Sequence, residues 1–456
     1  MPRQIDLFPR SKSPTIPVAN SHRLVQIADT LDWDQLQRRA QQIRLAKLKN
    51  AAGQPPHLRA TLGAMVLMGT RKLTYREAED LIQYYAPARY LCGLTESNWT
   101  PDFTTIQDFT ELMGEEGIRL INQYVIGLAV GKKLADPCTV VADTTAQEAA
   151  IPHPNEIGLM AGFLRSVTAA ASRVGGAMKK FIHRTAARFD AARQKAREYR
   201  LFAKTKPSKV LMMRQTATIV EKLNRSLGVA LEAVSASPRK LRGRAIVAKN
   251  KLRQLHRTMS TLLPQIRYWI RTGFVARGKI ISLHIPQLYA IVRGKVGKTV
   301  EFGLNWGITR LHGGYLLATL ARDRHELEDK KFAVRAVEDH AALFGQAPRS
   351  YAYDRGGYST QNVITLQKLG VKEVGLAPQG RTRWAVSEAT RVRLVRERAL
   401  VEAGIGTIKG LRYGFNRPAA RSMAMMGACG QRAVLGFNAN KLVRELARKK
   451  EIALSG

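Results

Sequence analysis

The spacing of apolar and polar residues changes character along this chain of 456 residues. From His57 to Gly131 apolar residues recur mostly at helical spacing, which predicts a series of short helices. Between Ala161 and Ile280 alanine, leucine and arginine dominate, which predicts long helices. Short runs of β-branched and apolar residues, typical of strands, lie between these two parts and again from Lys279 onward. The pattern therefore predicts an α/β protein whose strands are separated by a long helical insertion.

The strand signals and the helices between them predict one mixed sheet. Strands are expected at Cys138–Asp143, Lys279–Val292, Thr299–Trp306, Tyr315–Leu320, Ser350–Tyr353 and Val371–Ala377, and helices at Leu327–Phe344, Thr360–Leu369, Glu388–Lys409 and Ser422–Lys449. The second, third and fourth strands follow one another with short turns, as in an antiparallel meander. This order of elements favours a mixed sheet flanked by helices.

The part of the chain before the first strand is expected to be helical. A helix over His22–Lys49 is closed by Gly53-Gln54-Pro55-Pro56, and Thr74-Tyr75-Arg76-Glu77 has the spacing of a capping box that opens a helix reaching Tyr85. Two more helices are expected near Thr104–Met113 and Glu116–Val130. Short helices with polar turns suit a helix-turn-helix-like DNA-binding module and a plain helical bundle almost equally.

The insertion carries two rows of apolar residues at heptad spacing. The rows are Met213, Thr216, Val220, Leu223, Leu227, Ala230, Val234 and Leu241, Ala245, Ala248, Leu252, Leu255, Met259, Leu262. The turn Ser235-Ala236-Ser237-Pro238 separates them, which predicts an antiparallel hairpin with a coiled-coil seam. Residues 161–280 contain 28 Lys and Arg against 4 Asp and Glu. Solvated faces usually mix both signs, so this charge predicts contact with nucleic acid.

The composition limits the partners and the compartment. The net charge of +39 indicates a polyanionic partner, most often nucleic acid. An anionic membrane is the rival, but the chain has no apolar run near 18 residues and no lipidation motif. The polar N-terminus, Met1–Ser13, has no apolar core of a signal peptide, and Cys92, Cys138 and Cys429 lie too far apart for a zinc or disulfide pattern. A cytoplasmic protein is therefore expected.

Candidate catalytic residues lie at the ends of two predicted strands and on one predicted helix. Asp354 ends an apolar run and precedes a Gly-Gly turn, and Asp143 closes the run that begins at Thr139. Arg398, Glu402 and Lys409 are four and seven residues apart, so they share one face of a helix. An acid between two bases can hold a metal ion and a phosphate backbone at one place, and Asp143 supplies a further carboxylate.

Three motifs resemble the DDE motifs of bacterial insertion-sequence transposases. They are Asp143-Thr144-Thr145, Asp354-Arg355-Gly356-Gly357-Tyr358 and Arg398-x3-Glu402-x6-Lys409. The similarity runs from about His57 to Leu442, and Leu73–Arg89 followed by Pro101–Thr105 is similar to the N-terminal helical domain of one large group of them. The chain departs from the family at Val395, where a tyrosine often precedes the arginine. The resemblance implies a ribonuclease H-like catalytic core.

The resemblance also implies the cofactor and the roles of the site residues. It implies two Mg²⁺ ions, for which Mn²⁺ can substitute, held by Asp143, Asp354 and Glu402, with Asp143 bridging the ions. Hard cations prefer carboxylate oxygen, and paired ions serve phosphodiester cleavage. Hydrolysis at the end of the element would expose a 3′-OH, which would then attack target DNA. Arg398 and Lys409 are implied to contact phosphates.

Further DNA contacts, partners and regions are expected as follows. Arg355, in the second motif, and Arg381 and Arg383, in a Gly-rich loop beside Trp384, are candidate DNA contacts. The expected partners are terminal inverted repeats and target DNA, bound by a homodimer or a higher homo-oligomer in the bacterial cytoplasm, associated with the nucleoid. The expected regions are a basic lead and helix (1–55), a helical DNA-binding domain (56–132), a catalytic domain (133–155 with 278–415), a basic helical insertion (156–277) and a C-terminal helical region (416–456).

Among the acids of the last catalytic helix, Glu402 is predicted to be the third ligand. Its chain neighbours are apolar, and a carboxylate in such a setting is costly unless it is paired or bound to metal. Glu397 stands between two arginines, which suits an exposed ion pair, and Glu388 stands at the helix start, where an acid favours the helix dipole. Gly404 and Gly406 are expected either to admit a DNA backbone or to break the helix.

Two alternatives to a transposase remain. A non-catalytic DNA-binding protein would explain the charge, but it would not need three carboxylates on separate elements of a mixed sheet. A metal-dependent nuclease would share the carboxylates but would never join strands.

Overall fold

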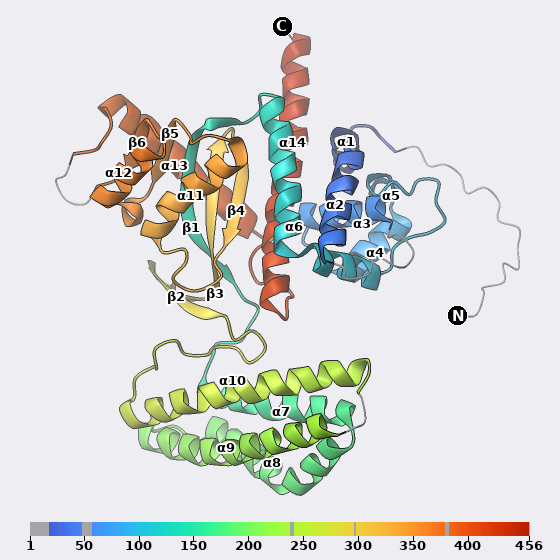
Figure 1. The fold of residues 1–456 in the computed structure, drawn as a ribbon, viewed down its shortest axis with the longest axis vertical. Coiled ribbons are helices and arrows are strands. Elements are labelled where there is room, and N and C mark those ends of the chain that lie inside the picture. The colour runs from blue at the N-terminus through green and yellow to red at the C-terminus, as the bar shows by residue number, and fades with distance from the viewer. Residues whose placement is uncertain (1–17, 48–56, 238–240, 296–297, 379–382, 456) are drawn as a thin grey trace, which may run out of the picture.

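The computed structural model describes residues 18–47, 57–237, 241–295, 298–378 and 383–455 (Figure 1). Its helices are α1 (Arg23–Thr30), α2 (Trp33–Lys47), α3 (Leu58–Thr70), α4 (Tyr75–Tyr84), α5 (Ala86–Leu91), α6 (Phe103–Gly131), α7 (Glu156–Val174), α8 (Ala177–Phe202), α9 (Lys206–Ala236), α10 (Arg244–Thr272), α11 (Asp329–Phe344), η1 (Arg355–Gly357), α12 (Thr360–Lys368), α13 (Glu388–Lys409) and α14 (Met423–Ser455). Its strands are β1 (Asp136–Glu148), β2 (Tyr289–Lys295), β3 (Lys298–His312), β4 (Leu316–Leu320), β5 (Ser350–Tyr353) and β6 (Glu373–Leu376).

The six strands form one mixed sheet, as the sequence predicts. The order is β2-β3-β1-β5-β6, and β4 pairs with β3 outside this path. β3 runs antiparallel to β1, β2 and β4, whereas β5 is parallel to both β1 and β6. Three strand boundaries differ from the prediction by five residues or more, one of them the end of β3, which continues past Trp306 to His312. β1 continues past Asp143 to Glu148 because it pairs with β3 over this whole length, and β2 begins only at Tyr289.

Helices cover both faces of the sheet. α11 and α12 pack on one face, where their apolar residues meet Val140 and Ala142 of β1 together with Tyr351 and Tyr353 of β5. α13 and α14 pack on the other face, around Val141. Successive residues of a strand point to opposite faces, so β1 contributes alternately to the two clusters. The alternation explains why β1 is apolar on both sides.

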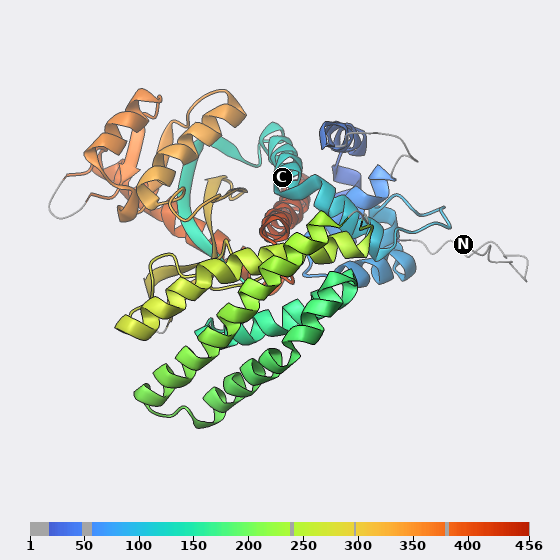
Figure 2. The ribbon, with the colours of Figure 1, turned by 60° about the horizontal axis from the view of Figure 1, so that its bottom comes forward.

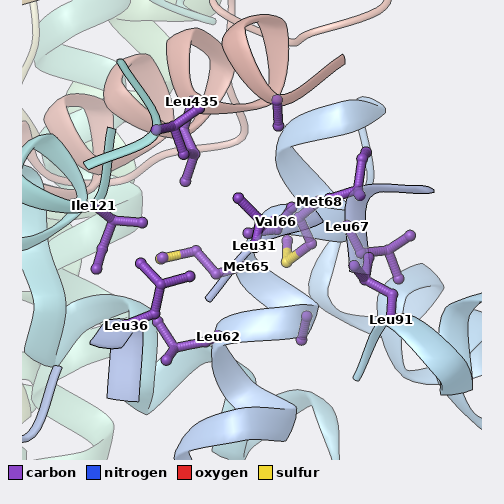
Figure 3. Close-up of a cluster of buried hydrophobic side chains, with 14 of the residues drawn as sticks. Leu31, Leu36, Leu62, Met65, Val66, Leu67, Met68, Leu91, Ile121 and Leu435 are labelled. Atoms are coloured by element: carbon purple, nitrogen blue, oxygen red, sulfur yellow. The ribbon is translucent and has the colours of Figure 1, made fainter. Parts of the chain in front are cut away.

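The N-terminal helices share one hydrophobic core with α6 and α14 (Figure 3). Leu36, Leu62 and Met65 meet in this cluster with Ile121 of α6 and Leu435 of α14. The predicted helix over His22–Lys49 is divided, because α1 ends where Leu31 takes an extended conformation and α2 begins at Trp33. The capping box is confirmed: the Thr74 side chain accepts from the backbone N–H of Glu77, and the Glu77 side chain accepts from that of Thr74.

The insertion is a bundle of four helices, α7 to α10, that extends from the end of the sheet (Figures 1 and 2). The described heptad positions from Met213 to Val234 and from Ala248 to Leu262 are buried between these helices. The prediction of a two-helix hairpin, α9 with α10, is therefore incomplete, because α7 and α8 also pack against these residues and make a four-helix bundle. Inside the bundle Asn224 bonds to Ser260 and to the His256 ring, at 2.9 and 3.1 Å, which favours one register of α9 against α10.

In the described part of the chain, no helix combines the length and the apolar character that crossing a bilayer requires.

The burial of the heptad rows leads to a stability prediction. We expect Leu252→Ala, at a fully buried position, to lower the free energy of unfolding of the bundle by about 2–5 kcal/mol, because it leaves a cavity. Val247→Ala, on the same helix but 69% exposed, is the matched control and should change it by less than about 0.5 kcal/mol. Urea unfolding of both variants measures this. Equal effects would show that Leu252 does not lie in the core of the bundle.

Candidate active site

Asp143 and Asp354 are neighbours because β1 and β5 are adjacent parallel strands. The register pairs Thr139 with Ser350 and Val141 with Ala352. Two residues further along each strand are Asp143, still within β1, and Asp354, the first residue after β5. Asp354 remains extended, with ψ near 180°, so the register carries the two carboxylates to the same level. The sequence predicts each aspartate at the end of a strand: Asp354 does follow β5, whereas Asp143 lies inside β1, which continues to Glu148.

The alternation of side chains places both aspartates on the face of the sheet that α13 covers. Val141 and Ala352 belong to the cluster beneath α13, and residues two positions apart share a face. By the same rule Thr144 points to the face covered by α11, where its hydroxyl donates to Asp329 at 2.8 Å. The candidate site thus lies between β1, β5 and α13.

The surroundings of Asp354 favour its neutral form. Burial raises the pKa of this carboxyl, and the nearby carboxylate of Asp329 raises it further. The backbone N–H groups of Gly356 and Gly357 and the Arg398 guanidinium oppose this rise, and the Gly356 N–H donates to the Asp354 side chain at 2.9 Å. A carboxylate whose charged form is this unfavourable is one that a bound cation would stabilise.

Asp329 lies beside the candidate site, although the sequence did not single it out. It is the first residue of α11, and its Oδ1 accepts hydrogen bonds from the Thr144 and Tyr353 hydroxyls, at 2.8 and 3.1 Å. A Cβ added at Gly356 would lie 2.6 Å from its other oxygen, so the turn after Asp354 needs glycine there. An acid in the first turn of a helix is common for reasons of the helix dipole, so the sequence offers no signal for this second role.

Arg398, Glu402 and Lys409 project from one side of α13, as their spacing predicts. Arg398 lies close enough to Asp354 to lower its pKa. The Lys409 ammonium lies 3.4 Å from the Thr145 hydroxyl and 3.6 Å from Glu301. α13 continues without a break past Gly404 and Gly406, so the predicted possibility of a break is wrong.

The expected environments of Glu402 and Glu397 are reversed in the structure. Glu402 is exposed, whereas the Glu397 side chain is only 13% exposed and bonds to Arg310 at 2.6 Å and to the His312 ring at 2.9 Å. Neighbours in a helical sequence lie about 100° apart around the axis, so apolar chain neighbours do not make an apolar setting. Glu388 stands in the first turn and pairs with Arg391, as expected.

The remaining candidates are the three arginines expected to contact DNA. Arg355 and Arg383 are exposed, and Arg381 lies outside the described residues.

Over the described ranges, no three Asp, Glu, His or Cys side chains lie close enough together to hold a metal ion. The strand register brings the two aspartates together, while Glu402 does not complete a metal site in this conformation.

Comparison with known proteins finds similarity to one protein family. Searches of curated proteins and of solved structures each found no match. Residues 14–112, which include α1 to α5 and the start of α6, match the family described as "Transposase domain (DUF772)". This part of the chain is similar to a transposase domain, which supports a transposase family.

Proposed function

We propose that this protein is an insertion-sequence transposase of the DDE type, with Asp143, Asp354 and Glu402 as its catalytic carboxylates. The observation that carries the proposal is the parallel pairing of β1 with β5, which brings Asp143 and Asp354 together under α13. The transposase domain match at residues 14–112 supports the same conclusion from a separate part of the chain. A mixed sheet covered by helices on both faces supports a ribonuclease H-like core.

The residues present suit Mg²⁺ or Mn²⁺. Asp143 and Asp354 offer hard oxygen ligands, and burial, together with the nearby Asp329 carboxylate, raises the pKa of Asp354, a cost that a bound cation would offset. Two bound ions would make a nucleophile from water, or from a 3′-OH, at neutral pH and stabilise the leaving 3′ oxygen. Asp143 and Asp354 supply ligands from the rigid sheet. The exposed Glu402 side chain completes the set by turning toward them from α13.

The other side chains of the site orient the DNA and the aspartates. Arg398, beside Asp354, and Lys409, beside Thr145, would contact phosphates near the scissile bond. Asp329 positions β1 against β5 through the Thr144 and Tyr353 hydroxyls. The exposed arginines Arg355 and Arg383, together with Arg381, would add contacts to the DNA backbone. Terminal inverted repeats and target DNA are the proposed partners, bound by a homodimer or a higher homo-oligomer.

The decisive experiment uses the DNA that flanks the coding region. A plasmid that carries these flanks as terminal repeats should be cut in the presence of Mg²⁺, and the released 3′ ends should join to a second DNA. A non-catalytic DNA-binding protein would cut nothing, and a nuclease would cut without producing joined strands.

The identity of the third carboxylate is tested by two substitutions in α13. Glu402→Gln should abolish Mg²⁺-dependent cleavage and strand joining while leaving the melting temperature and DNA affinity unchanged, because the side chain is exposed. Glu397→Gln should keep most activity but lower the free energy of unfolding by about 1–3 kcal/mol, since it weakens the pairing of Arg310. Glu388→Gln, at an exposed position, is the control for both. Normal cleavage by Glu402→Gln would remove this residue from the site.

The electrostatic cost at Asp354 predicts a gain in stability when its charge is removed. The pKa of Asp354 is raised in the folded protein, so stability is lost as the pH rises through that raised value and is retained below the ordinary pKa of an aspartate. Asp354→Asn should therefore raise the melting temperature at pH 7 without metal, and the gain should vanish near pH 3, as thermal unfolding at the two pH values would measure.

The same variant tests metal binding. Mg²⁺ should raise the melting temperature of the unsubstituted protein and leave that of Asp354→Asn unchanged. Asp108→Asn, at an exposed position of α6, is the matched control and should still respond to Mg²⁺. A response to Mg²⁺ that survives Asp354→Asn would exclude this carboxylate as a ligand.

The insertion is proposed to bind DNA through phosphates. Basic residues far outnumber acidic residues in it, and Arg184 and Arg188 are exposed one turn apart on α8. If both contact phosphates, the double change Arg184→Gln with Arg188→Gln should make the slope of log affinity against log salt less steep by about 1.8, equally for unrelated DNA sequences. The full chain is titrated with duplex DNA at several salt concentrations. An unchanged slope would show that this face of α8 does not meet the backbone.

A further inference from the structure

A cavity lies away from the aspartates, between the end of α13, α14 and the start of α1. Its volume is about 240 Å³, and Thr407 of α13 forms part of its wall. Thr407 and Lys409 are two residues apart, so they lie on nearly opposite sides of the helix. The cavity therefore opens on the side of α13 that faces away from the candidate active site.

The rim of this cavity is strongly cationic. Arg23, Arg412, Lys441 and Arg444 line it, and no acid does. Glu445, outside the lining, bonds to Lys441 at 3.2 Å and to Arg444 at 3.4 Å, which offsets only part of the charge. Burial lowers the pKa of Lys441, so an anion in the cavity would stabilise its charged form. The rim thus favours a phosphate-containing ligand.

The wall of the cavity holds a buried amide that the described part of the chain leaves unsatisfied. Asn440 is 4% exposed, its side-chain nitrogen and oxygen are enclosed, and neither has a hydrogen-bond partner among the described residues, so a ligand reaches them when this side chain turns toward the cavity. A buried polar group without a partner is costly, and here both a donor and an acceptor are free. A phosphate could accept from the nitrogen but could not donate to the oxygen. The edge of a nucleobase offers both functions.

Aromatic rings complete the lining. Tyr413 and Phe437 meet edge to face with their centroids 5.8 Å apart, and the Arg412 guanidinium lies 5.5 Å from the centre of the Tyr413 ring. Aromatic and guanidinium surfaces bind unstacked bases whatever their sequence. The volume is slightly below that of pockets for drug-sized ligands, which suits one nucleotide rather than a longer segment.

We propose that this cavity binds a single unpaired nucleotide, with its base edge on Asn440, its ring against the aromatic lining and its phosphate on the arginines. A nucleotide of a DNA strand and a free nucleotide share this chemistry. Only binding of a nucleotide within a DNA strand rests on the proposed function.

The test uses the full chain without metal, so that no cleavage takes place. Binding of dAMP, of 2-deoxyribose 5-phosphate and of single-stranded oligodeoxyadenylate is measured by calorimetry. We expect dAMP to bind at least about tenfold more tightly than the sugar phosphate, since adenine can pair with an amide through two hydrogen bonds. Tighter binding of the oligonucleotide than of dAMP would support a strand as the source, and the reverse order would support a free nucleotide.

Two variants and a control separate recognition from folding. Asn440→Leu should weaken dAMP binding about tenfold or more and should also raise the melting temperature, because it removes an unsatisfied buried amide. Arg412→Gln, on the exposed rim, should weaken binding of dAMP and of the sugar phosphate alike. Arg448→Gln, exposed on α14 outside the lining, should change neither.

The proposal is overturned if Asn440→Leu binds dAMP as tightly as the unsubstituted protein, or if the sugar phosphate binds as tightly as dAMP. Because no metal and no cleavage enter the measurement, a failure of the chemistry at Asp143 and Asp354 would leave this result unaffected.

Discussion

The pairing of β1 is the constraint on which the rest of the molecule depends. β1 lies between β3 and β5, and its hydrogen bonds to both hold Asp143 beside Asp354. The same pairing explains how the sheet accepts a large insertion. Glu148, at the end of β1, and Tyr289, at the start of β2, both pair with Gly303, one on each edge of β3. The two ends of the insertion therefore lie about two strand spacings apart, roughly 10 Å. The chain can leave the sheet, form the bundle and return to the sheet without disturbing the pairing of the strands.

The two flanks of α13 differ: one makes structural contacts, and the other carries the residues proposed for the chemistry. A buried stripe of Leu394, Val401, Ile405 and Ile408 packs it on the sheet. On one flank the half-buried Glu397 joins it to β3, and on the other Arg398 and Glu402 stand toward the aspartates. A helix held by an ion pair on one side can present the opposite side in a defined orientation, while an exposed Glu402 keeps the freedom to turn. This division is consistent with a site that is completed when DNA and metal bind.

The part that matches a transposase domain is joined to the sheet through a continuous core. The cluster around Met65 includes Leu435 of α14 and also Leu311 and Tyr315 at the end of β3 and the start of β4 (Figure 3). A core that is packed this closely transmits the placement of one part to the other, because interiors have few voids in which to relax. The proposed recognition of DNA by the N-terminal helices and the proposed chemistry at the sheet would therefore occur in a fixed relation.

The sequence by itself determined most of the elements and placed each aspartate in or after a strand, because strand periodicity, capping residues and helical spacing are local signals, whereas the parallel pairing of β1 with β5 brought the two aspartates together. The extent of α13 and the capping box at Thr74 follow from neighbouring residues alone, and so does the common face of Arg398, Glu402 and Lys409. Only the tertiary structure decided that Glu397 is half-buried and Glu402 exposed, since burial depends on which side of a helix meets the sheet. It also decided the contact of Asp329 with Thr144 and the enclosure of Asn440, because each joins segments that are distant in the chain, and local patterns carry no signal of such contacts.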